Sequence, residues 1–574
     1  MGGAIGRREI DSVGRMLEAE RHRGPDGDGV YSDEQVVLGH RRLSIIDLSL
    51  TGKQPMSNEH GTIWVTFNGE IYNYRELTQE LQGAGHEFRS NTDTEVLLHG
   101  FEEWGIEGLV RRLLGMFAFA LYDASVPGDW RVFLVRDRLG IKPLYYHASA
   151  ESLAFASEVG ALVKSGLASG EADLTGLVGF LAQGSVPSPW TCVRNAKCLE
   201  AGHFMMVQRN RQCVAKYWTL SYSSDGPDQG ADLLRDSVVR HLVADVPVGL
   251  FLSGGVDSAG LVALARRRHD GLIVTLTITF DEDQFNEGKM ASRFAERFRT
   301  EHHEIRITAK TFMDHLPRFF SSVDQPTCDG INTYLVSLAA SRLGLKVVLS
   351  GLGGDEVYFG YRHYRVLANH PNWVDRYGAL QPAFRDALAR MMALYGSVRS
   401  QERWRRFGYW RWCPPPLALY LLFRGFYPEA EIGELLGMDE KRVRETLLSA
   451  FESQYTELPL APAHVFNRME MQHYLHDQLL RDSDVFSMAH SLELRVPYLD
   501  HRLVESLAAV EPANKVDQFL NKPRLVNAIE DDLVSTTARN RKMGFSFPLA
   551  TWIKEHAAEL EARCLSGSHF DPRA

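Results

Sequence analysis

VPVGLFLSGGVDS, at residues 246–258, predicts a buried strand followed by a glycine-rich loop and a helix. The apolar run 246–252 is typical of a strand that is covered on both faces. Gly254 and Gly255 have no side chains, so the backbone there can approach a phosphate closely. A helix that begins near Asp257 would add free N–H groups and partial positive charge. The stretch therefore predicts a phosphate-binding loop, and an ordinary strand–turn–helix connection is the alternative.

A second glycine-rich loop, SGLGGDE at residues 350–356, follows the apolar run 347–349. The carboxyl ends of parallel strands meet at one edge of a sheet, where α/β proteins bind ligands. Asp355 would then lie opposite Asp257, and the two could hold Mg²⁺, which takes few carboxylates together with phosphate oxygens. A purely structural turn is the alternative.

Length and composition exclude several classes of protein. The 574 residues are 44% hydrophobic and 24% charged, as in ordinary globular proteins, and the formal net charge is −10. This charge argues against sequence-independent binding of nucleic acid, which needs a basic surface. No apolar run approaches the roughly 18 residues of a membrane helix. Charged residues at positions 7–11 are unlike a signal peptide, so we expect a cytoplasmic protein.

Two domains are predicted. Residues 1–218 combine short β-like runs and turns with helical patterns at 74–82 and 93–104, which indicates an α+β layered domain. A polar segment at 219–230, containing Gly and Pro, is interpreted as a linker. From residue 231 to 574, strands alternate with helices and then give way to mostly helical sequence, which favours a parallel sheet with a helical C-terminal part.

Several ordered motifs resemble one known family over nearly the whole chain. They are RLSII at 42–46, NGEIYN at 68–73, DTE at 93–95, RDRLG at 136–140, the two loops, SMAHSLELRVP at 487–497 and KMGF at 542–545. The chain resembles the asparagine synthetase family of glutamine-dependent amidotransferases. The first loop is similar to that of ATP pyrophosphatases, which cleave ATP between its α- and β-phosphates.

The resemblance implies an N-terminal-nucleophile αββα sandwich followed by a parallel-sheet ATP-pyrophosphatase domain. The implied reaction uses ATP and Mg²⁺ to convert a carboxylic acid into an acyl-adenylate, which ammonia from glutamine then amidates. The resemblance also suggests a homodimer, with no nucleic acid or membrane as partner.

The glutaminase half departs from the family at its nucleophile. Family members carry a cysteine after the initiator Met, and here that position is Gly2, which cannot form a thioester. The first cysteine in the chain is Cys192. The natural protein either uses ammonia or another amine, or a cysteine was replaced here to trap bound glutamine. The sequence leaves both explanations open.

The implied glutamine pocket is otherwise complete. By resemblance, Arg42 pairs with the α-carboxylate of glutamine, and Asp93 binds its α-ammonium group. Asn68 and Gly69 form the oxyanion hole, and Glu70 belongs to the same binding set. The alternatives are a surface arginine, a hairpin turn at residues 68–69 and a helix cap at residue 93.

The synthetase half keeps the residues that the resemblance assigns to ATP. These are Ser253, Gly254, Gly255 and Ser258 around the pyrophosphate, Asp257 and Asp355 on Mg²⁺, Lys522 and Lys542 as catalytic cations, and Leu252, Ile278, Ser350 and Gly351 around the adenosine.

One residue departs from the asparagine-forming pattern. Those members carry a glutamate at the position of Leu352, and leucine can neither accept a proton nor pair with an ammonium. A less polar acid than aspartate is therefore expected as the acceptor, unless Glu356 supplies the missing charge. Two other functions stay open: a β lactam synthetase-like ligase or cyclase that uses an amine, and a non-catalytic glutamine-binding homologue.

Overall fold

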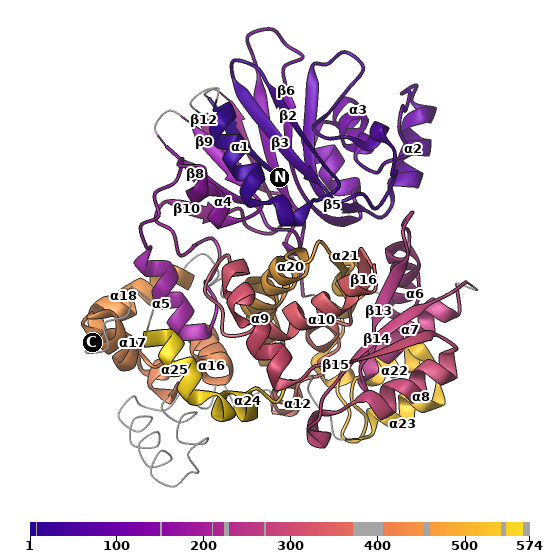
Figure 1. Ribbon diagram of the computed structural model, residues 1–574, viewed down its shortest axis with the longest axis vertical. Coiled ribbons are helices and arrows are strands. Elements are labelled where there is room, and N and C mark those ends of the chain that lie inside the picture. The colour runs from indigo at the N-terminus through magenta and orange to yellow at the C-terminus, as the bar shows by residue number, and fades with distance from the viewer. Residues whose placement is uncertain are drawn as a thin grey trace.

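The protein consists of two layered parts that pack against each other (Figure 1). The computed structural model describes residues 1–6, 9–149, 152–208, 211–222, 229–268, 271–370, 406–451, 460–540 and 547–565. None of the helices in these ranges combines the length and the apolar composition needed to cross a bilayer.

The first part contains two six-stranded sheets with antiparallel neighbours. One sheet has the order β10-β8-β9-β1-β3-β2, and its strands are β1 (Gly2–Ile5), β2 (Gly27–Ser32), β3 (Val36–Arg42), β8 (Tyr145–Ala148), β9 (Leu153–Ala156) and β10 (Ala196–Cys198). The other has the order β12-β11-β7-β6-β5-β4, with β4 (Met56–Ser57), β5 (Ile63–Ile71), β6 (Gly115–Asp123), β7 (Arg131–Arg136), β11 (His203–Gln208) and β12 (Arg211–Lys216).

Helices cover the outer face of each sheet. Apolar residues of α1 (Ile10–Ala19) and α4 (Val159–Lys164) form one core with the first sheet. Those of α2 (Tyr74–Gly83) and α3 (Glu95–Arg112) form another with the second sheet. A further apolar core contains residues of both sheets and lies between them. The four layers make the αββα sandwich, and the helices predicted at 74–82 and 93–104 are confirmed.

The second part is built on a five-stranded parallel sheet of order β15-β14-β13-β16-β17. Its strands are β13 (Val248–Phe251), β14 (Val274–Thr279), β15 (Glu301–Arg306), β16 (Val347–Leu349) and β17 (Glu493–Arg495). The helices of this region are α6 (Gly230–His241), α7 (Val256–Arg266), α8 (Gly288–Phe298), α9 (Ala309–Ser322) and α10 (Ile331–Arg342). The two-domain fold class expected from the sequence is confirmed.

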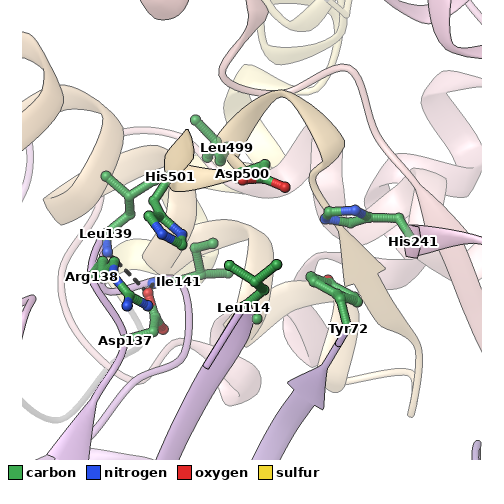
Figure 2. Close-up of a pocket in the computed structure, with 11 residues that line it drawn as sticks. Tyr72, Leu114, Asp137, Arg138, Leu139, Ile141, His241, Leu499, Asp500 and His501 are labelled. Carbon is green, nitrogen blue, oxygen red and sulfur yellow. Dashed lines mark hydrogen bonds between the residues drawn. The ribbon is translucent and has the colours of Figure 1, made fainter. Parts of the chain in front are cut away.

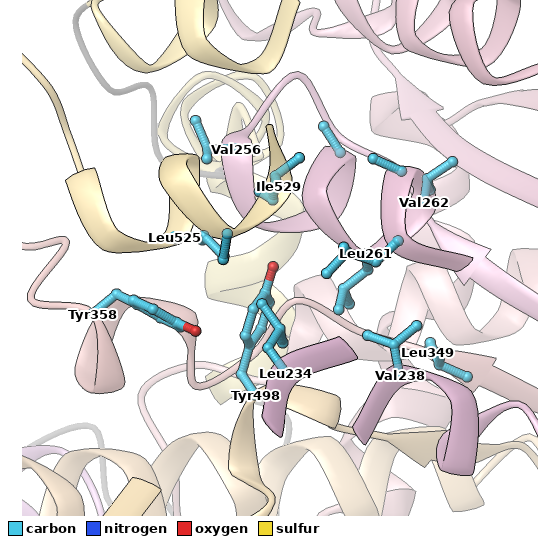
Figure 3. Close-up of a cluster of buried hydrophobic side chains, with 14 of the residues drawn as sticks. Leu234, Val238, Val256, Leu261, Val262, Leu349, Tyr358, Tyr498, Leu525 and Ile529 are labelled. Carbon is cyan, nitrogen blue, oxygen red and sulfur yellow. The ribbon is translucent and has the colours of Figure 1, made fainter. Parts of the chain in front are cut away.

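An apolar core fixes the helix that follows the first glycine-rich loop. Val256, Leu261 and Val262 of α7 are buried in it with residues of α6 (Figure 3). Ile529 of α22 (Pro523–Ile529) also belongs to this core, and a Cβ atom at Gly260 would lie 2.5 Å from its Cδ1. This close packing holds α7 rigidly, so the loop at its N-terminus has a defined position.

The C-terminal part is helical. Its helices are α11 (Gly354–Val357), α12 (Arg362–Asn369), α16 (Pro415–Arg424), α17 (Glu429–Leu436), α18 (Glu440–Phe451), α19 (Pro462–Met469), a π-helical segment (Glu470–Leu480), α20 (Arg481–Met488), α21 (His501–Ala508), α22, α23 (Asp532–Ala538), α24 (Leu549–Glu555) and α25 (Ala557–Leu565). Helix α5 (Leu174–Gln183), which precedes the predicted linker, packs against α16, α17 and α18 (Figure 1).

Candidate functional site

The two glycine-rich loops lie side by side because their strands are neighbours. Strand β13 pairs in parallel with β16, so the two strands end at the same edge of the sheet. A Cβ atom at Gly351 would lie 2.9 Å from the Asp257 Cβ, and one at Gly354 would lie 2.6 Å from Asp257 Oδ1. Side chains at these two glycines would therefore push the loops apart.

Hydrogen bonds within the first loop hold its hydroxyl groups inward. Ser258 Oγ lies 2.8 Å from Ser253 Oγ and accepts a hydrogen bond from the Ser253 N–H at 3.0 Å. The Gly255 N–H donates to Ser253 Oγ at 3.1 Å, and the Gly254 N–H donates to Glu287 Oε2 at 3.1 Å. Burial raises the pKa of Glu287, although the Gly254 N–H acts in the opposite direction. An anion at this loop would compete with that carboxylate.

Lys522 joins the two loops. Its Nζ lies 2.5 Å from both carboxylate oxygens of Asp257 and 2.7 Å from Asp355 Oδ1. The residue is buried and adopts a left-handed backbone conformation with φ of 52°. Burial alone would lower the pKa of this ammonium, but Asp257 and Asp355 together raise it. The charged Lys522 ammonium therefore lies between the two carboxylates.

The residues predicted around the adenosine also converge near these loops. Leu252 and Ile278 have buried side chains, so only their backbones can face a nucleotide. The Leu252 N–H donates to the Leu276 carbonyl at 2.9 Å, and the Ser350 N–H donates to the Arg495 carbonyl at 2.9 Å. The strand ends thus fix the backbone of Ser350 and of the adjoining Gly351.

Leu352 stands where asparagine-forming members carry a glutamate, and Glu356 is the neighbour that could supply the missing charge. These two residues differ in their surroundings. Leu352 is half-buried and packs against the apolar core that surrounds α7. Glu356 is buried, and its Oε1 accepts a hydrogen bond from the Tyr361 hydroxyl at 2.8 Å. Burial raises the pKa of Glu356 to about 7, with further contributions from Asp355 and Glu470. The Glu356 carboxylate is thus held by Tyr361 at the back of the loop.

The predicted glutamine-binding residues line a cavity of about 80 Å³, which Met488 and Glu493 of the second part also line. The lining includes Met1, Arg42, Asn68, Gly69, Glu70 and Asp93. The Arg42 guanidinium donates to the carbonyls of Asp47 and Ser49, the latter at 2.8 Å. A Cβ atom at Gly52 would lie 2.2 Å from Arg42 Nη2, so the glycine makes room for this side chain.

Asn68 and Gly69, the residues predicted to form an oxyanion hole, lie side by side in the cavity lining. Asn68 Nδ2 is buried and has no hydrogen-bond partner among the described residues. Gly69 has φ of +145°, and a Cβ atom there would lie 2.0 Å from the Met116 carbonyl oxygen, so no other residue fits. An unpaired donor beside the cavity can bind a developing negative charge without rearrangement.

The two acidic residues of the pocket have different partners. Asp93 Oδ2 accepts a hydrogen bond from the Ile71 N–H at 2.8 Å, and burial raises the pKa of Asp93 to about 6. Glu70 Oε2 instead accepts a hydrogen bond from Arg495 Nη2 at 2.7 Å, across the boundary between the two parts. Burial raises the pKa of Glu70 even though Arg495 lowers it.

A small cavity of about 10 Å³ lies at the boundary between the parts (Figure 2). Tyr72 and Asp137 approach it from the first part, and His241 and His501 approach it from the second. The rings of Tyr72 and His241 have their centroids 3.9 Å apart. This volume is close to the minimum for one water molecule.

Comparisons with known proteins agree with both halves of the site. A glutamine amidotransferase domain matches residues 1–218, and an asparagine synthase domain matches residues 229–574.

The chain belongs to the asparagine synthetase family.

Three relatives illustrate the extent of the match. Asparagine synthetase [glutamine-hydrolyzing] 1 of Bacillus subtilis is 31% identical, over 97% of this chain and 87% of its own length. A putative asparagine synthetase of Mycobacterium bovis is also 31% identical, over 96% and 87%. Amidase chry2 of Gibberella zeae is 28% identical, over 88% and 79%. The protein is thus an asparagine synthetase-like enzyme, a carbon–nitrogen ligase of a family that uses ATP.

The surroundings of residues 1 and 2 bear on the predicted position of the missing nucleophile, and Gly2 stays a prediction for that position. Met1 is among the residues that line the cavity beside Arg42 and Asp93, and Gly2 is not. A Cβ atom at Gly2 would lie 3.2 Å from Met16 Sδ, so a side chain there would face α1. Neighbouring residues of a strand face opposite sides, which puts residue 1 on the side of the cavity. The methionine thioether there is no substitute for a thiolate nucleophile.

The remaining predicted residues fall into two groups. Ser253, Gly254, Gly255, Asp257, Ser258, Ser350, Gly351, Asp355 and Lys522 come together at one sheet edge, whereas Lys542 lies outside the described residues. No role was predicted for Glu287 or Tyr361 from the sequence. Arg495 lies within the motif 487–497, where it is a charged residue flanked by apolar ones, and this pattern could have marked it as a buried arginine.

Proposed function

We propose that this enzyme uses ATP to activate a carboxylic acid as an acyl-adenylate and then amidates it, forming AMP and pyrophosphate. The observation that carries this proposal is the position of Lys522 Nζ between Asp257 and Asp355, at the carboxyl ends of adjacent parallel strands. This edge is where α/β sheets bind nucleotides.

The donor set at this position fits a magnesium ion. Carboxylate oxygens are its preferred ligands, and the space between Asp257 and Asp355 already accepts a positive group. Mg²⁺, when bound, would neutralise charge on the phosphate oxygens of ATP. Lys522 would then move from the carboxylates toward the pyrophosphate, where its ammonium stabilises the negative charge that develops.

The loop residues supply the other contacts for pyrophosphate. The amides of Gly254 and Gly255 and the hydroxyls of Ser253 and Ser258 exchange their present internal partners for phosphate oxygens. This arrangement favours displacement at the α-phosphorus by positioning and charge stabilisation. The acid oxygen forms the new P–O bond as pyrophosphate leaves, and the amine nitrogen then displaces AMP from the acyl carbon.

Leu352 supports an acceptor acid that is less polar than aspartate. Its side chain adds an apolar wall beside the loop, while the Glu356 carboxylate is bonded to Tyr361. The relative named Amidase chry2 is consistent with a family that acts on more than one acid. Ligation of an amine, as in β lactam synthetase-like enzymes, is the second candidate, and the absence of a nucleophilic side chain at residues 1 and 2 favours it.

The glutamine cavity is proposed to bind glutamine whether or not it is hydrolysed. Arg42 and Asp93 would hold the α-carboxylate and α-ammonium groups, and Asn68 and Gly69 would face the side-chain amide. The boundaries 1–218, 219–230 and 231–574, a homodimer and a cytoplasmic location also stay predictions. Residues 223–228 of the predicted linker lie outside the described ranges.

The proposed reaction predicts AMP release from Mg-ATP that depends on a carboxylic acid and a nitrogen donor. We would measure AMP and pyrophosphate with aspartate and a panel of less polar acids, using ammonium chloride or glutamine. We expect AMP with ammonium but not with glutamine, and none in the Asp355→Asn variant. Formation of ADP, or failure of the protein to bind Mg-ATP, would contradict the proposal. Turnover with aspartate would show that a site with leucine at position 352 still accepts aspartate as the acid.

Arg42→Met is expected to weaken glutamine binding by about 10- to 100-fold, because it removes charged hydrogen bonds of about 1.5–3 kcal/mol. Isothermal titration with glutamine measures the change. Arg194→Met is the matched control, since Arg194 is not among the residues that line the cavity and pairs with the exposed Glu171 at 2.6 Å. Equal affinities in the wild-type protein and Arg42→Met would exclude this residue from the binding set.

A further inference from the structure

A cluster of histidine and carboxylate side chains lies in the first part, and none of its members lines the cavity beside Arg42. His99 on α3 is its centre and has only 1% of its side chain exposed. Glu59, in the turn between β4 and β5, places Oε1 3.5 Å from His99 Nε2. Glu95, one turn earlier on α3, places Oε1 3.6 Å from the same nitrogen.

The His99 Nε2 atom is buried, and no hydrogen-bond partner for it exists within the described ranges. The three ligand atoms of His99, Glu59 and Glu95 all lie within 4.8 Å of one another. Zinc bonds of about 2.0–2.2 Å to nitrogen and oxygen, in a tetrahedron, require ligand atoms roughly 3.3 Å apart. The observed separations of 3.5 and 3.6 Å need only a small contraction to enclose such an ion.

The neighbours of these three residues match those of metal ligands. His99 Nδ1 lies 3.1 Å from Glu102 Oε2, and Asn58 Nδ2 donates to Glu102 Oε1 at 2.8 Å. A ligating histidine usually has its second nitrogen fixed by a carboxylate in this way. Glu95 is fixed as well, since it accepts the N–H groups of Arg89 and Ser90, each at 2.8 Å.

We propose that His99 Nε2, Glu59 and Glu95 bind a divalent transition-metal cation of the zinc class, oriented by Glu102. The mixed nitrogen and oxygen donors suit Zn²⁺ or Co²⁺ better than Mg²⁺. Glu59 is partly exposed, with 27% of its side chain accessible, so the ion has a path from solvent. The ion would fasten the β4–β5 turn to the start of α3, next to Thr94, which lines the glutamine cavity. This inference does not depend on the proposed ligase reaction.

The test is titration of Co²⁺ into the full-length protein after treatment with a chelator. We expect one equivalent to give visible absorption bands, and added Zn²⁺ to remove them. Glu59→Gln should weaken Co²⁺ binding at least tenfold, and Glu102→Gln by about 10- to 100-fold. Glu59→Gln should leave the fold intact, because Glu59 is partly exposed, so its effect is separable from unfolding. Glu103→Gln is the matched control, since Glu103 pairs with His86 Nε2 at 3.3 Å and is not one of the proposed ligands.

Two results would overturn the assignment. If His99 serves only as a positively charged partner of the surrounding carboxylates, the wild-type protein gives no cobalt bands. If His86→Gln abolishes the bands and Glu59→Gln leaves them intact, the ion binds instead at His99 Nδ1, with His86 and Glu102. Magnesium binding at Asp257 and Asp355 does not confuse either result, because those carboxylates offer no nitrogen ligand and Asp355→Asn should leave the bands unchanged.

Discussion

Lys522→Met is expected to lower AMP formation by at least about 100-fold, which is the usual effect of removing a group that stabilises transition-state charge. The Lys522 ammonium contacts Asp257 at 2.5 Å and Asp355 at 2.7 Å, so it lies where the two loops meet. Methionine has a similar length and no charge. The measurement is kcat for AMP release at saturating Mg-ATP, with Lys522→Arg as a variant that retains the charge.

A second readout separates this role from a general loss of structure. Without the ammonium, Asp257 and Asp355 lack their shared cation, so Mg²⁺ alone should raise the melting temperature of Lys522→Met more than that of the wild-type protein. Lys554→Met is the control, because Lys554 is exposed on α24. An additional Asp355→Asn change should abolish the extra stabilisation. Equal magnesium effects in the wild-type protein and Lys522→Met would refute this account of the site.

The sequence predicted both glycine-rich loops because the evidence for them is local. Each loop follows an apolar run that forms a strand, and the second loop contains two glycines that the packing requires, Gly351 and Gly354. The contact of Lys522 with both carboxylates could not be predicted in the same way. Lys522 and Asp257 are 265 residues apart, and only the packing of α22 against α7 brings them together.

The orientation of residues 1 and 2 could not be predicted for a different reason. A shift of one position reverses the face of a strand to which a side chain points, and the motif at the chain start does not specify that face. Strand β1 pairs Gly2 with Gly39 and with Ala156, and this register turns residue 2 toward α1. The sequence motifs did group Arg42, Asn68, Gly69 and Asp93, which all line one cavity, and binding of glutamine there stays a prediction.

Arg495 could not be given a role from sequence, because its partners come from both parts of the molecule. Its guanidinium donates to Glu493 at 2.8 Å, to Glu70 at 2.7 Å and to the carbonyls of His241 and Val243 at 2.9 and 2.6 Å. Its own carbonyl accepts the Ser350 N–H at 2.9 Å. One buried residue thus contacts a glutamine-pocket residue and the second glycine-rich loop.

Arg495→Met is therefore expected to destabilise the protein by about 3–5 kcal/mol, since it leaves buried carboxylates and carbonyls without their partner. Urea unfolding should show this as a lower free energy for the first cooperative transition. Arg235→Met is the matched control, because Arg235 pairs with the exposed Asp232 and Glu530, and loss of a surface pair costs about 1 kcal/mol or less.

A double-mutant cycle with Glu70→Gln tests whether the two parts are coupled through this ion pair. If they are, Glu70→Gln should cost much less in the Arg495→Met background than in the wild-type protein, with a coupling energy of about 1–3 kcal/mol. Additive effects would show that Arg495 stabilises only its own part, through Glu493 and the two carbonyls. Coupling would instead show that the Arg495–Glu70 ion pair stabilises the contact between the two parts.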